Sequence, residues 1–581
     1  MSASRRHRGE TRVVVTSKRG RFLVAEPLFE QGGRISLGGG KRISPGRMAL
    51  VELEGGRARV LADLGRPDRA ADVVAALLRE RELEAGFRPK LDTEAREAAA
   101  SPPGDRGARR DLTELPTLTV DPATARDFDD AVSAEETDGG VRLWVHIADV
   151  AAHVRPGSPL DREAYRRANS TYVPASVVPM LPPALSSDAC SLTPGTERLT
   201  VTAEIELSDG GETRSARFYR SRIRSDVRLD YDELDEIFAG RRAAPEHVAG
   251  TLTLARRTAA ALRERRAGRA LEVSSAEPEF VFEDGHVTAA HAIVQTESHS
   301  LIEQLMVLTN ERVAELLERK RVPTLYRVHE QPDPDRVAGL IAQLAALEIP
   351  TPPLPKNLSP SQAGRIAVEA SRLATREAAR RGHGLEAYTS LVLRSLKQAQ
   401  YSDRNLGHAG LGSPAYVHFT SPIRRYPDLI AHRGLLSVVG AGERPPRAEQ
   451  LGEAGVWCSD RERDASKLER QADDICAAFV LERELFERGH AAEFEGEVSG
   501  VINAGAFIRF GGALADVYEG FLPARRIGGR ERYELDETET MLVGGRGGGV
   551  VRIGDAVTVG VDGVDAPRGR VDLFPADRER R

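Results

Sequence analysis

Four aspartates fall within ten residues of one another in the segment DPATARDFDD. They are Asp121, Asp127, Asp129 and Asp130. The apolar run LTV precedes this segment and AV follows it, which places the acids between two expected strands and not in a polar linker. Aspartate is short and has little side-chain freedom, so it suits oxygen coordination of a hard divalent ion such as Mg²⁺. The spacing predicts a metal site, with a solvated acidic turn as the alternative.

Several carboxylates around Mg²⁺ are what a phosphoryl-transfer site needs. Two ions roughly 4 Å apart can activate water and stabilise the leaving oxygen of a phosphodiester. An EF-hand is excluded because its DxDxDG spacing and closing glutamate are absent. We therefore expect chemistry on phosphate with Mg²⁺ as cofactor, for which Mn²⁺ can substitute.

A second group of residues that suits phosphate lies in HFTSPIRRYPDLIAHRGLL, far along the chain. Ser421 is a good helix N-cap and Pro422 suits the first helical position, so we expect a helix to begin there. Arg424 and Arg425 would then lie in the first turn, where positive charge is unfavourable unless an anion joins it. The pattern favours a phosphate clamp, and a surface ion pair with Asp428 is the alternative.

A chain of 581 residues is too long for one hydrophobic core. Short β-rich runs broken by glycines predict a small barrel at each end, around a long α/β region. We expect four segments: an N-terminal OB/cold-shock-like barrel (1–66), a helical lead-in and linker (67–114), a large α/β domain (115–488) and a C-terminal OB fold (491–576).

Helical periodicity is clear in six stretches of the large domain. The expected helices cover 245–267, 300–320, 360–381, 385–399, 422–438 and 447–488. The runs VRLWVHIADVAAHV and LTVTAEIEL predict strands earlier in the same domain. These elements must bring the acidic segment and the arginine segment together if the two act on one phosphate.

Composition limits where the protein works. The net charge of −6 does not by itself indicate a nucleic-acid partner. The three cysteines are far apart and lack zinc-ligand spacing, no run approaches the ~18 apolar residues of a membrane helix, and the basic, polar start argues against a secretory signal. We expect a cytoplasmic protein without a membrane partner, and a monomer with no obligatory protein partner.

Four segments, in order, resemble the successive motifs of the ribonuclease II / ribonuclease R family, closer to the ribonuclease R branch. They are DPATARDFDDAV, NSTYVPASVVPMLPPALSSDACSL, HSLIEQLMVLTN and HFTSPIRRYPDLIAHR. The resemblance implies a multidomain α+β protein, with a mixed α/β RNB catalytic domain between small OB-type β-barrels at both ends. The C-terminal barrel would be an RNA-binding fold of the ribosomal protein S-one type. The implied activity is processive, hydrolytic 3′→5′ degradation of single-stranded RNA with a free 3′ end to nucleoside 5′-monophosphates, by a two-metal-ion mechanism, in RNA turnover.

The resemblance also implies roles for individual residues. The four aspartates would be the metal ligands, with Asp129 and Asp130 catalytic, and Arg424 would engage the phosphates at the scissile bond. Tyr172 would hold the 3′-terminal nucleotide. The further RNA contacts would be Tyr231 and Glu303, which distinguish RNA from DNA, and Glu469 near the RNA path. To these the residues themselves add Arg425 from the arginine segment, and Phe507 and Phe510 as stacking faces in the C-terminal barrel.

The chain departs from the family pattern at three places. Val273 stands where the family has a second aromatic against the last base, and Gln304 stands where a second glutamate is usual. The N-terminal end has room for one small barrel, whose stacking faces would be Phe22 and Phe29. Binding of RNA by this barrel is therefore in doubt.

Two other classes of function compete with the exoribonuclease. A catalytically silent RNA-binding or translation-regulating relative would be expected to lose metal aspartates, and all four are present. A metal-dependent DNA exonuclease is disfavoured by Tyr231 and Glu303. We interpret His299, His329 and His432 as structural, because no third metal ligand accompanies them.

Overall fold

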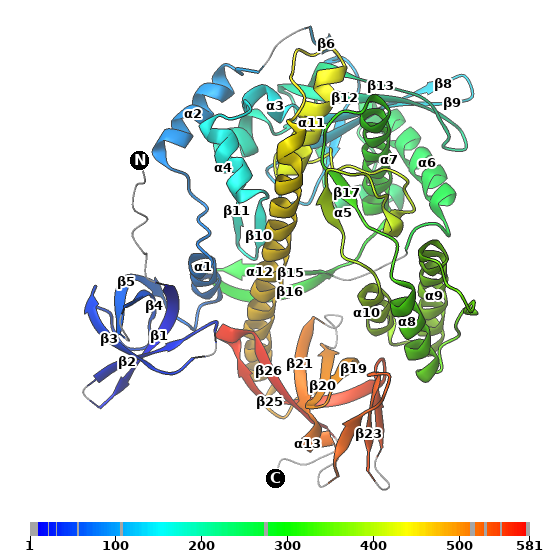
Figure 1. Cartoon of the computed structure of the whole chain (residues 1–581). Coiled ribbons are helices and arrows are strands. Elements are labelled where there is room, and N and C mark those ends of the chain that lie inside the picture. The colour runs from blue at the N-terminus through cyan, green and yellow to red at the C-terminus, as the bar shows by residue number, and fades with distance from the viewer. Residues whose placement is uncertain are drawn as a thin grey trace.

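The computed structural model (Figure 1) describes residues 10–20, 22–30, 32–54, 57–104, 108–271, 277–511, 517–527, 531–545 and 549–576. A β-barrel lies at each end of the chain, and a large α/β domain lies between them, as the sequence predicts. The long helix α12 (Ala448–Arg488) runs from the central domain to the C-terminal barrel. No described helix has the length and apolar character needed to cross a membrane.

The N-terminal barrel closes in the strand order β1-β2-β3-β5-β4. Its strands are β1 (Thr11–Arg19), β2 (Phe22–Pro27), β3 (Ile35–Gly40), β4 (Met48–Glu54) and β5 (Arg57–Gly65). Small aliphatic side chains such as Val14, Val51 and Val60 fill its interior. The helix α1 (Ala70–Glu80) packs against it, and the carboxylate of Glu80 accepts a hydrogen bond from the backbone N–H of Val13 at 2.6 Å.

A seven-stranded sheet forms the centre of the large domain, in the order β14-β7-β8-β9-β12-β13-β6. Its strands are β6 (Arg110–Asp111), β7 (Leu118–Val120), β8 (Asp130–Thr137), β9 (Gly140–Ala148), β12 (Glu197–Ser208), β13 (Thr213–Arg224) and β14 (Val227–Leu229). The pairs β8–β9, β9–β12 and β12–β13 are antiparallel. The strand β14 runs parallel to β7, which brings it beside the start of the acidic segment.

The helices predicted from periodicity are present with small differences at their ends. They are α6 (Ala249–Arg266), α7 (Glu297–Lys320), α9 (Pro360–Arg381), α10 (Leu385–Ser395), α11 (Tyr426–Val438) and α12. Periodicity did not single out α8 (Pro334–Ala346), which Asp333 caps. The helical lead-in contains α1 and α2 (Pro89–Ala100). The large α/β domain also contains the shorter helices α3 (Val150–His153), α4 (Pro159–Arg167) and α5 (Tyr231–Phe238).

The predicted start of α11 is wrong. The helix begins at Tyr426, and Ser421 and Pro422 lie in a preceding turn. Two carboxylates hold this turn: the N–H of Ile423 donates to Asp129 Oδ1, distant in sequence, at 2.8 Å, and the N–H of Ser421 donates to Asp428 Oδ1, in the first turn of α11, at 2.8 Å. These bonds override the preference for a helix start at Ser421.

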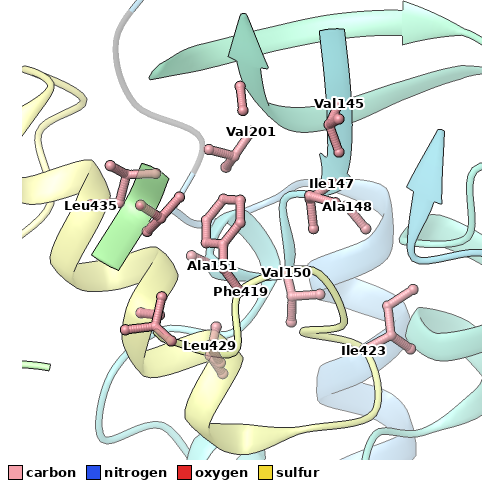
Figure 2. Close-up of a cluster of buried hydrophobic side chains, with 14 of the residues drawn as sticks. Val145, Ile147, Ala148, Val150, Ala151, Val201, Phe419, Ile423, Leu429 and Leu435 are labelled. Carbon is pink, nitrogen blue, oxygen red and sulfur yellow. The ribbon is translucent and has the colours of Figure 1, made fainter. Parts of the chain in front are cut away.

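The turn before α11 is anchored in the main hydrophobic core. Figure 2 shows Phe419 and Ile423 among strand and helix side chains that include Ile147, Val201 and Leu429. Phe419 and Ile423 have no exposed surface. Because Arg424 directly follows Ile423, the core fixes the position from which the arginine side chain extends.

Two short hairpins complete the surroundings of the site. One pairs β10 (Thr171–Val173) with β11 (Ser176–Val178), and the other pairs β15 (Glu277–Glu283) with β16 (His286–Ile293). Figure 1 shows both hairpins beside α12. A third short pair joins β17 (Tyr326–Val328) to β18 (Gln400–Ser402).

The C-terminal barrel closes in the order β19-β20-β21-β26-β25. Its strands are β19 (Glu493–Ile502), β20 (Gly505–Phe510), β21 (Tyr518–Pro523), β25 (Ala556–Asp565) and β26 (Arg570–Pro575). The short α13 (Ala524–Ile527) and a small sheet of β22 (Tyr533–Leu535), β23 (Met541–Gly544) and β24 (Val550–Arg552) are inserted between β21 and β25. Gly554 (φ +88°) meets the ring of Tyr388 on α10, where a Cβ would come within 2.3 Å of it, so the barrel fits closely against the central domain.

Candidate active site

The acidic segment is the loop between β7 and β8, and several backbone bonds hold it. The N–H of Asp121 donates to Leu229 O on β14 at 3.2 Å, and the N–H of Ala148 donates to Asp129 O at 2.9 Å. Ser191 Oγ accepts from the N–H of Phe128 at 3.0 Å and donates to Arg126 O at 2.9 Å. The loop is thus fixed at both ends and in its middle.

Burial raises the pKa values of three of the aspartates, and repulsion from neighbouring aspartates adds to the effect for Asp121 and Asp129. Loss of water, and then the charge of Asp130, raise the pKa of Asp121 to about 8. Burial also raises the pKa of Asp130 to about 6 and that of Asp129 well above its usual value, although Arg424 opposes both changes. A carboxyl group with a pKa of about 8, as in Asp121, needs a positive partner to be ionised at neutral pH.

The carboxylate oxygens fit a divalent cation in chemistry but do not form a closed cage. Asp121 Oδ2 and Asp129 Oδ2 are buried and have no hydrogen-bond partner. Among the residues that the structure describes, no three His, Cys, Asp or Glu side chains are close enough together to hold one ion. The charges of Asp127 and Asp130 nevertheless act on both Asp121 and Asp129, so the four predicted ligands are near enough to interact. The two unsatisfied oxygens suit Mg²⁺ or Mn²⁺.

Arg228 on β14 is a feature of the site that the sequence patterns did not reveal. Its Nη2 donates to Pro122 O at 2.8 Å and to Ala123 O at 2.9 Å, and its guanidinium lies 5.1 Å from the ring centre of Phe128. Its charge also lowers the pKa of Asp121, against the larger effect of burial. The parallel pairing of β14 with β7 brings Arg228 here, so its place at the site could not be predicted from spacing along the chain.

The two arginines of the second segment have different environments. The side chain of Arg424 is 44% exposed, and its Nε lies 3.5 Å from Asp129 Oδ2. Arg425 instead turns inward and donates to Asp428 Oδ1 at 2.8 Å, which raises its pKa further. This ion pair engages Nη2 of Arg425, and the RNA contact of Arg425 stays a prediction. Arg424 is the arginine presented to the acidic loop.

Tyr172 connects the acidic loop to α12. Its hydroxyl donates to Asp127 Oδ2 at 2.8 Å, and its backbone N–H donates to Glu469 Oε1 at 2.8 Å. Three residues that the sequence nominated separately are therefore in contact. Burial and the charge of Asp127 raise the pKa of the Tyr172 hydroxyl, which stays protonated and able to donate.

Tyr231 and Glu303 lie on two helices, α5 and α7. The ring of Tyr231 stacks on that of His299, with ring centres 3.9 Å apart, and Asp130 and Asp121 add to the effect of burial in raising the pKa of its hydroxyl. Glu303 is exposed, and partial desolvation raises its pKa. Its neighbour Gln304 accepts a hydrogen bond from Arg266 Nη1 at 3.1 Å. Val273 lies outside the described residues.

The histidines interpreted as structural and the two aromatic residues of the N-terminal barrel lie outside the acidic loop. His432 is buried, stacks on Phe419 and contacts Phe419 O at 2.8 Å, which agrees with a structural role. His329 contacts His408. Phe22 is 64% exposed, and Phe29 packs partly against the core beside α1.

A cavity of about 1680 Å³ leads to the site. Asp127 and Tyr172 line it at one end, the β15–β16 hairpin and α12 line it along its length, and Arg509 and Glu519 of the C-terminal barrel line it at the other end. The register pairs Arg509 with Glu519 and Phe507 with Phe521, so both pairs lie on one face of the β20–β21 ladder. The rings of Phe507 and Phe521 are 5.3 Å apart.

Phe510 requires a correction as a predicted stacking residue. It has no exposed surface and packs against Phe494 and Tyr518 inside the barrel. Side chains alternate along β20, so Phe507 and Arg509 face outward while Ile508 and Phe510 face the core. Phe507 is the aromatic of this strand that remains available to a ligand.

Comparison with known proteins agrees with this geometry. The model of the RNB domain family matches residues 109–441, which is more than half of the chain. The chain belongs to the ribonuclease II / ribonuclease R family. Among its relatives, ribonuclease R of Vibrio parahaemolyticus is 35% identical over 486 residues, which cover 81% of this chain and 56% of that protein. This RNB protein thus spans little more than half the length of that curated relative.

Solved structures share the fold of this RNB protein. Mycoplasma genitalium RNase R, in complex with ribose-methylated single-stranded RNA, is 24% identical, with a TM-score of 0.85 over 98% of this chain and 90% of that chain. Yeast Ssd1, described as a pseudonuclease, is 16% identical, with a TM-score of 0.66 over 93% of this chain and 68% of that chain. The fold is therefore shared by an RNA-bound ribonuclease and by a protein described as a pseudonuclease.

Proposed function

We propose that this RNB protein is a hydrolytic 3′→5′ exoribonuclease that degrades single-stranded RNA processively to nucleoside 5′-monophosphates, with Mg²⁺ or Mn²⁺ as cofactor. One observation supports the proposal most directly. Buried aspartate oxygens without hydrogen-bond partners lie close to Arg424, next to a cavity lined by residues of two domains. Family membership supports it. We propose that the chain is organised as four segments, 1–66, 67–114, 115–488 and 491–576, and that the third contains the catalytic site.

Asp121, Asp127, Asp129 and Asp130 would hold the cation or cations, which would supply Lewis acidity for hydrolysis of a phosphodiester. Arg424 lies beside Asp129, where its guanidinium can donate to phosphate oxygens that gain negative charge in the transition state. An arginine so placed favours the transition state over the ground state. Arg425 acts behind it, because its ion pair with Asp428 helps to hold the turn that precedes α11.

The exposed ring of Tyr172 would stack on the 3′-terminal nucleotide, and Glu469 holds the backbone from which that ring extends. Tyr231 and Glu303 would recognise the 2′-hydroxyl, which separates RNA from DNA. Phe507 would stack on bases farther from the 3′ end, since it shares a face of the ladder with cavity-lining Arg509. Stacking is indifferent to sequence, which suits an enzyme that advances along any strand.

A single digestion experiment tests this function. Matched RNA and DNA oligomers, and a duplex with a 3′ overhang, are incubated with Mg²⁺ or with EDTA, and the products are resolved by size. We expect stepwise shortening of RNA from its 3′ end, release of nucleoside 5′-monophosphates, no cleavage in EDTA and little cleavage of DNA. Equal degradation of DNA, or cleavage that persists in EDTA, would contradict the proposal.

A catalytically silent RNA-binding protein is the second candidate, because the fold is shared with yeast Ssd1, described as a pseudonuclease. The four aspartates and the exposed arginine beside Asp129 favour the nuclease. RNA binding without any product in the same experiment would support the silent alternative.

A further inference from the structure

The Tyr172 side chain faces the cavity and the acidic loop at once. Its ring lines the cavity and the residue is 39% exposed, while its hydroxyl donates to Asp127 Oδ2 at 2.8 Å. A phenol ring can stack on a base through its face while its hydroxyl keeps a hydrogen bond in the plane of the ring. One rigid side chain therefore connects the place for a nucleotide to a carboxylate of the acidic loop.

The backbone around Tyr172 leaves this side chain little freedom. On β10, Thr171 and Val173 are buried and Tyr172 alone points outward. Its N–H is engaged by Glu469 of α12 at 2.8 Å, and it pairs with Val177 of β11 in register. The strand and the helix fix the backbone of Tyr172, and the hydroxyl contact restrains its ring.

An ionised carboxylate offers about four lone-pair positions, and the Tyr172 hydroxyl takes one of them on Asp127 Oδ2. The other positions stay open to a cation. Hydrogen bonds to a ligating carboxylate orient it, and their loss typically weakens metal binding roughly 10–100-fold. The contact is thus an orienting bond that leaves Asp127 free to bind a cation.

We propose that the Tyr172 hydroxyl is a positioning group for Asp127, and that through it the RNA 3′ end and the divalent cation bind cooperatively. A nucleotide that stacks on the ring limits the motion of the hydroxyl and thereby holds Asp127 in place to bind the cation. In the other direction, a cation bound to Asp127 holds the hydroxyl and the ring in place to stack on the nucleotide. The coupling is reciprocal by thermodynamic necessity. The inference rests on the proposed function for the nature of the nucleotide, but the effect on the cation does not depend on it.

The test measures Mn²⁺ affinity by electron paramagnetic resonance on the full chain, with and without a short RNA whose 3′-terminal linkages are non-hydrolysable methylenephosphonates. The variant is Tyr172→Phe, which keeps the ring and removes the hydroxyl. The matched control is Tyr219→Phe, since the Tyr219 hydroxyl donates to a carboxylate oxygen of Glu204 at 2.7 Å on β12, and neither residue lines the cavity.

In the wild type we expect RNA to increase the affinity for Mn²⁺. We expect Tyr172→Phe to weaken Mn²⁺ binding about tenfold and to lose this increase in Mn²⁺ affinity on addition of RNA. RNA affinity in EDTA should stay within about twofold, because the stacking face is intact, and Tyr219→Phe should behave as wild type. Unchanged Mn²⁺ affinity with unchanged tightening in Tyr172→Phe would overturn the inference, as would an equal loss in the Tyr219→Phe control. If the proposed function is wrong but this inference is right, RNA will stay intact in the digestion experiment, while the Mn²⁺ affinities will change as expected in the resonance experiment.

Discussion

The two ends of the cavity differ in how their charges are satisfied. At the acidic loop, carboxyl groups crowd together, their pKa values are raised, and two buried oxygens have no hydrogen-bond partner. At the C-terminal barrel, Arg509 pairs closely with Glu386, Glu519 accepts a hydrogen bond from Ser499, and Phe507 packs beside Phe521. At the first end, burial keeps the pKa values of the carboxyl groups raised although Arg424 and Arg228 lie beside them. At the second end, Arg509 is paired with a carboxylate and aromatic surface lies next to it.

Under the proposed function, this difference separates catalysis from binding in space. A site with unsatisfied carboxylates gains most from a cation, and a cation beside Arg424 would stabilise the negative charge that a phosphodiester gains in the transition state. A wall of paired charges and partly exposed rings contributes chiefly stacking, which changes little between ground state and transition state. Substitutions at the acidic end should therefore lower kcat, and substitutions at the barrel end should weaken RNA affinity.

The largest effect is expected for Asp129→Asn. Asp129 accepts the Ile423 N–H and lies beside Arg424, so the amide preserves the shape of the side chain but removes its charge. We expect kcat for RNA hydrolysis to fall on the order of 10³-fold or more, with RNA affinity within a few-fold of wild type. Single-turnover kinetics and filter binding measure the two quantities. The exposed Asp138→Asn is the control, and a near-wild-type rate for Asp129→Asn would show that the acidic end is not catalytic.

Arg424→Gln should have the next largest effect. The glutamine can still reach phosphate oxygens but carries no charge, so we expect kcat to fall about 10²-fold. RNA affinity should change less than kcat, because Arg424 serves the transition state in particular. A loss confined to KM would instead assign Arg424 to substrate binding and weaken the contrast between the two ends.

Phe507→Ala should produce the opposite pattern at the barrel end. Loss of one stacking face costs about 1–3 kcal/mol, so RNA affinity should fall roughly tenfold while kcat at saturating RNA is unchanged. Fluorescence anisotropy with a labelled RNA measures the affinity. Phe22→Ala, at the exposed Phe22 of the N-terminal barrel, is the matched control and should change affinity less than twofold. An equal effect of both variants would assign the two barrels the same role.

The smallest effect concerns stability and pH in EDTA. Asp121 has a pKa of about 8 in the folded protein and about 3.9 in an unfolded chain. The folded state therefore keeps a proton that the unfolded state has lost, so the free energy of unfolding falls as pH rises from about 4 to 8. Asp121→Asn removes this penalty and should raise Tm at pH 8 by at least roughly 2 °C.

Calorimetry in EDTA at pH 5 and pH 8 measures this stability difference. Addition of Mn²⁺ at pH 8 should stabilise the wild type more than Asp121→Asn, because the cation takes over the neutralisation that the proton supplied. A wild-type Tm that does not fall between the two pH values would show that the acidic end is already neutralised by the protein itself.

The sequence by itself determined the local elements and the chemical identity of the site. Helical periodicity located α12 and most of the other helices, because each buries a continuous apolar stripe that local spacing reveals. The four aspartates and Arg424 stood out by residue type, and their motifs resembled those of the family to which the chain belongs. These features depend on neighbours along the chain, which a sequence displays directly.

Only the tertiary structure decided which of these residues meet. Asp129, from elsewhere in the fold, accepts the N–H of Ile423 and helps to hold the turn before α11, so the helix begins at Tyr426 instead of Ser421. Strand alternation buried Phe510, and parallel pairing brought Arg228 onto the acidic loop. The bond from Tyr172 to Asp127 joins residues 45 positions apart. Hydrogen bonds and burial between distant segments set these outcomes, and no local pattern encodes such contacts.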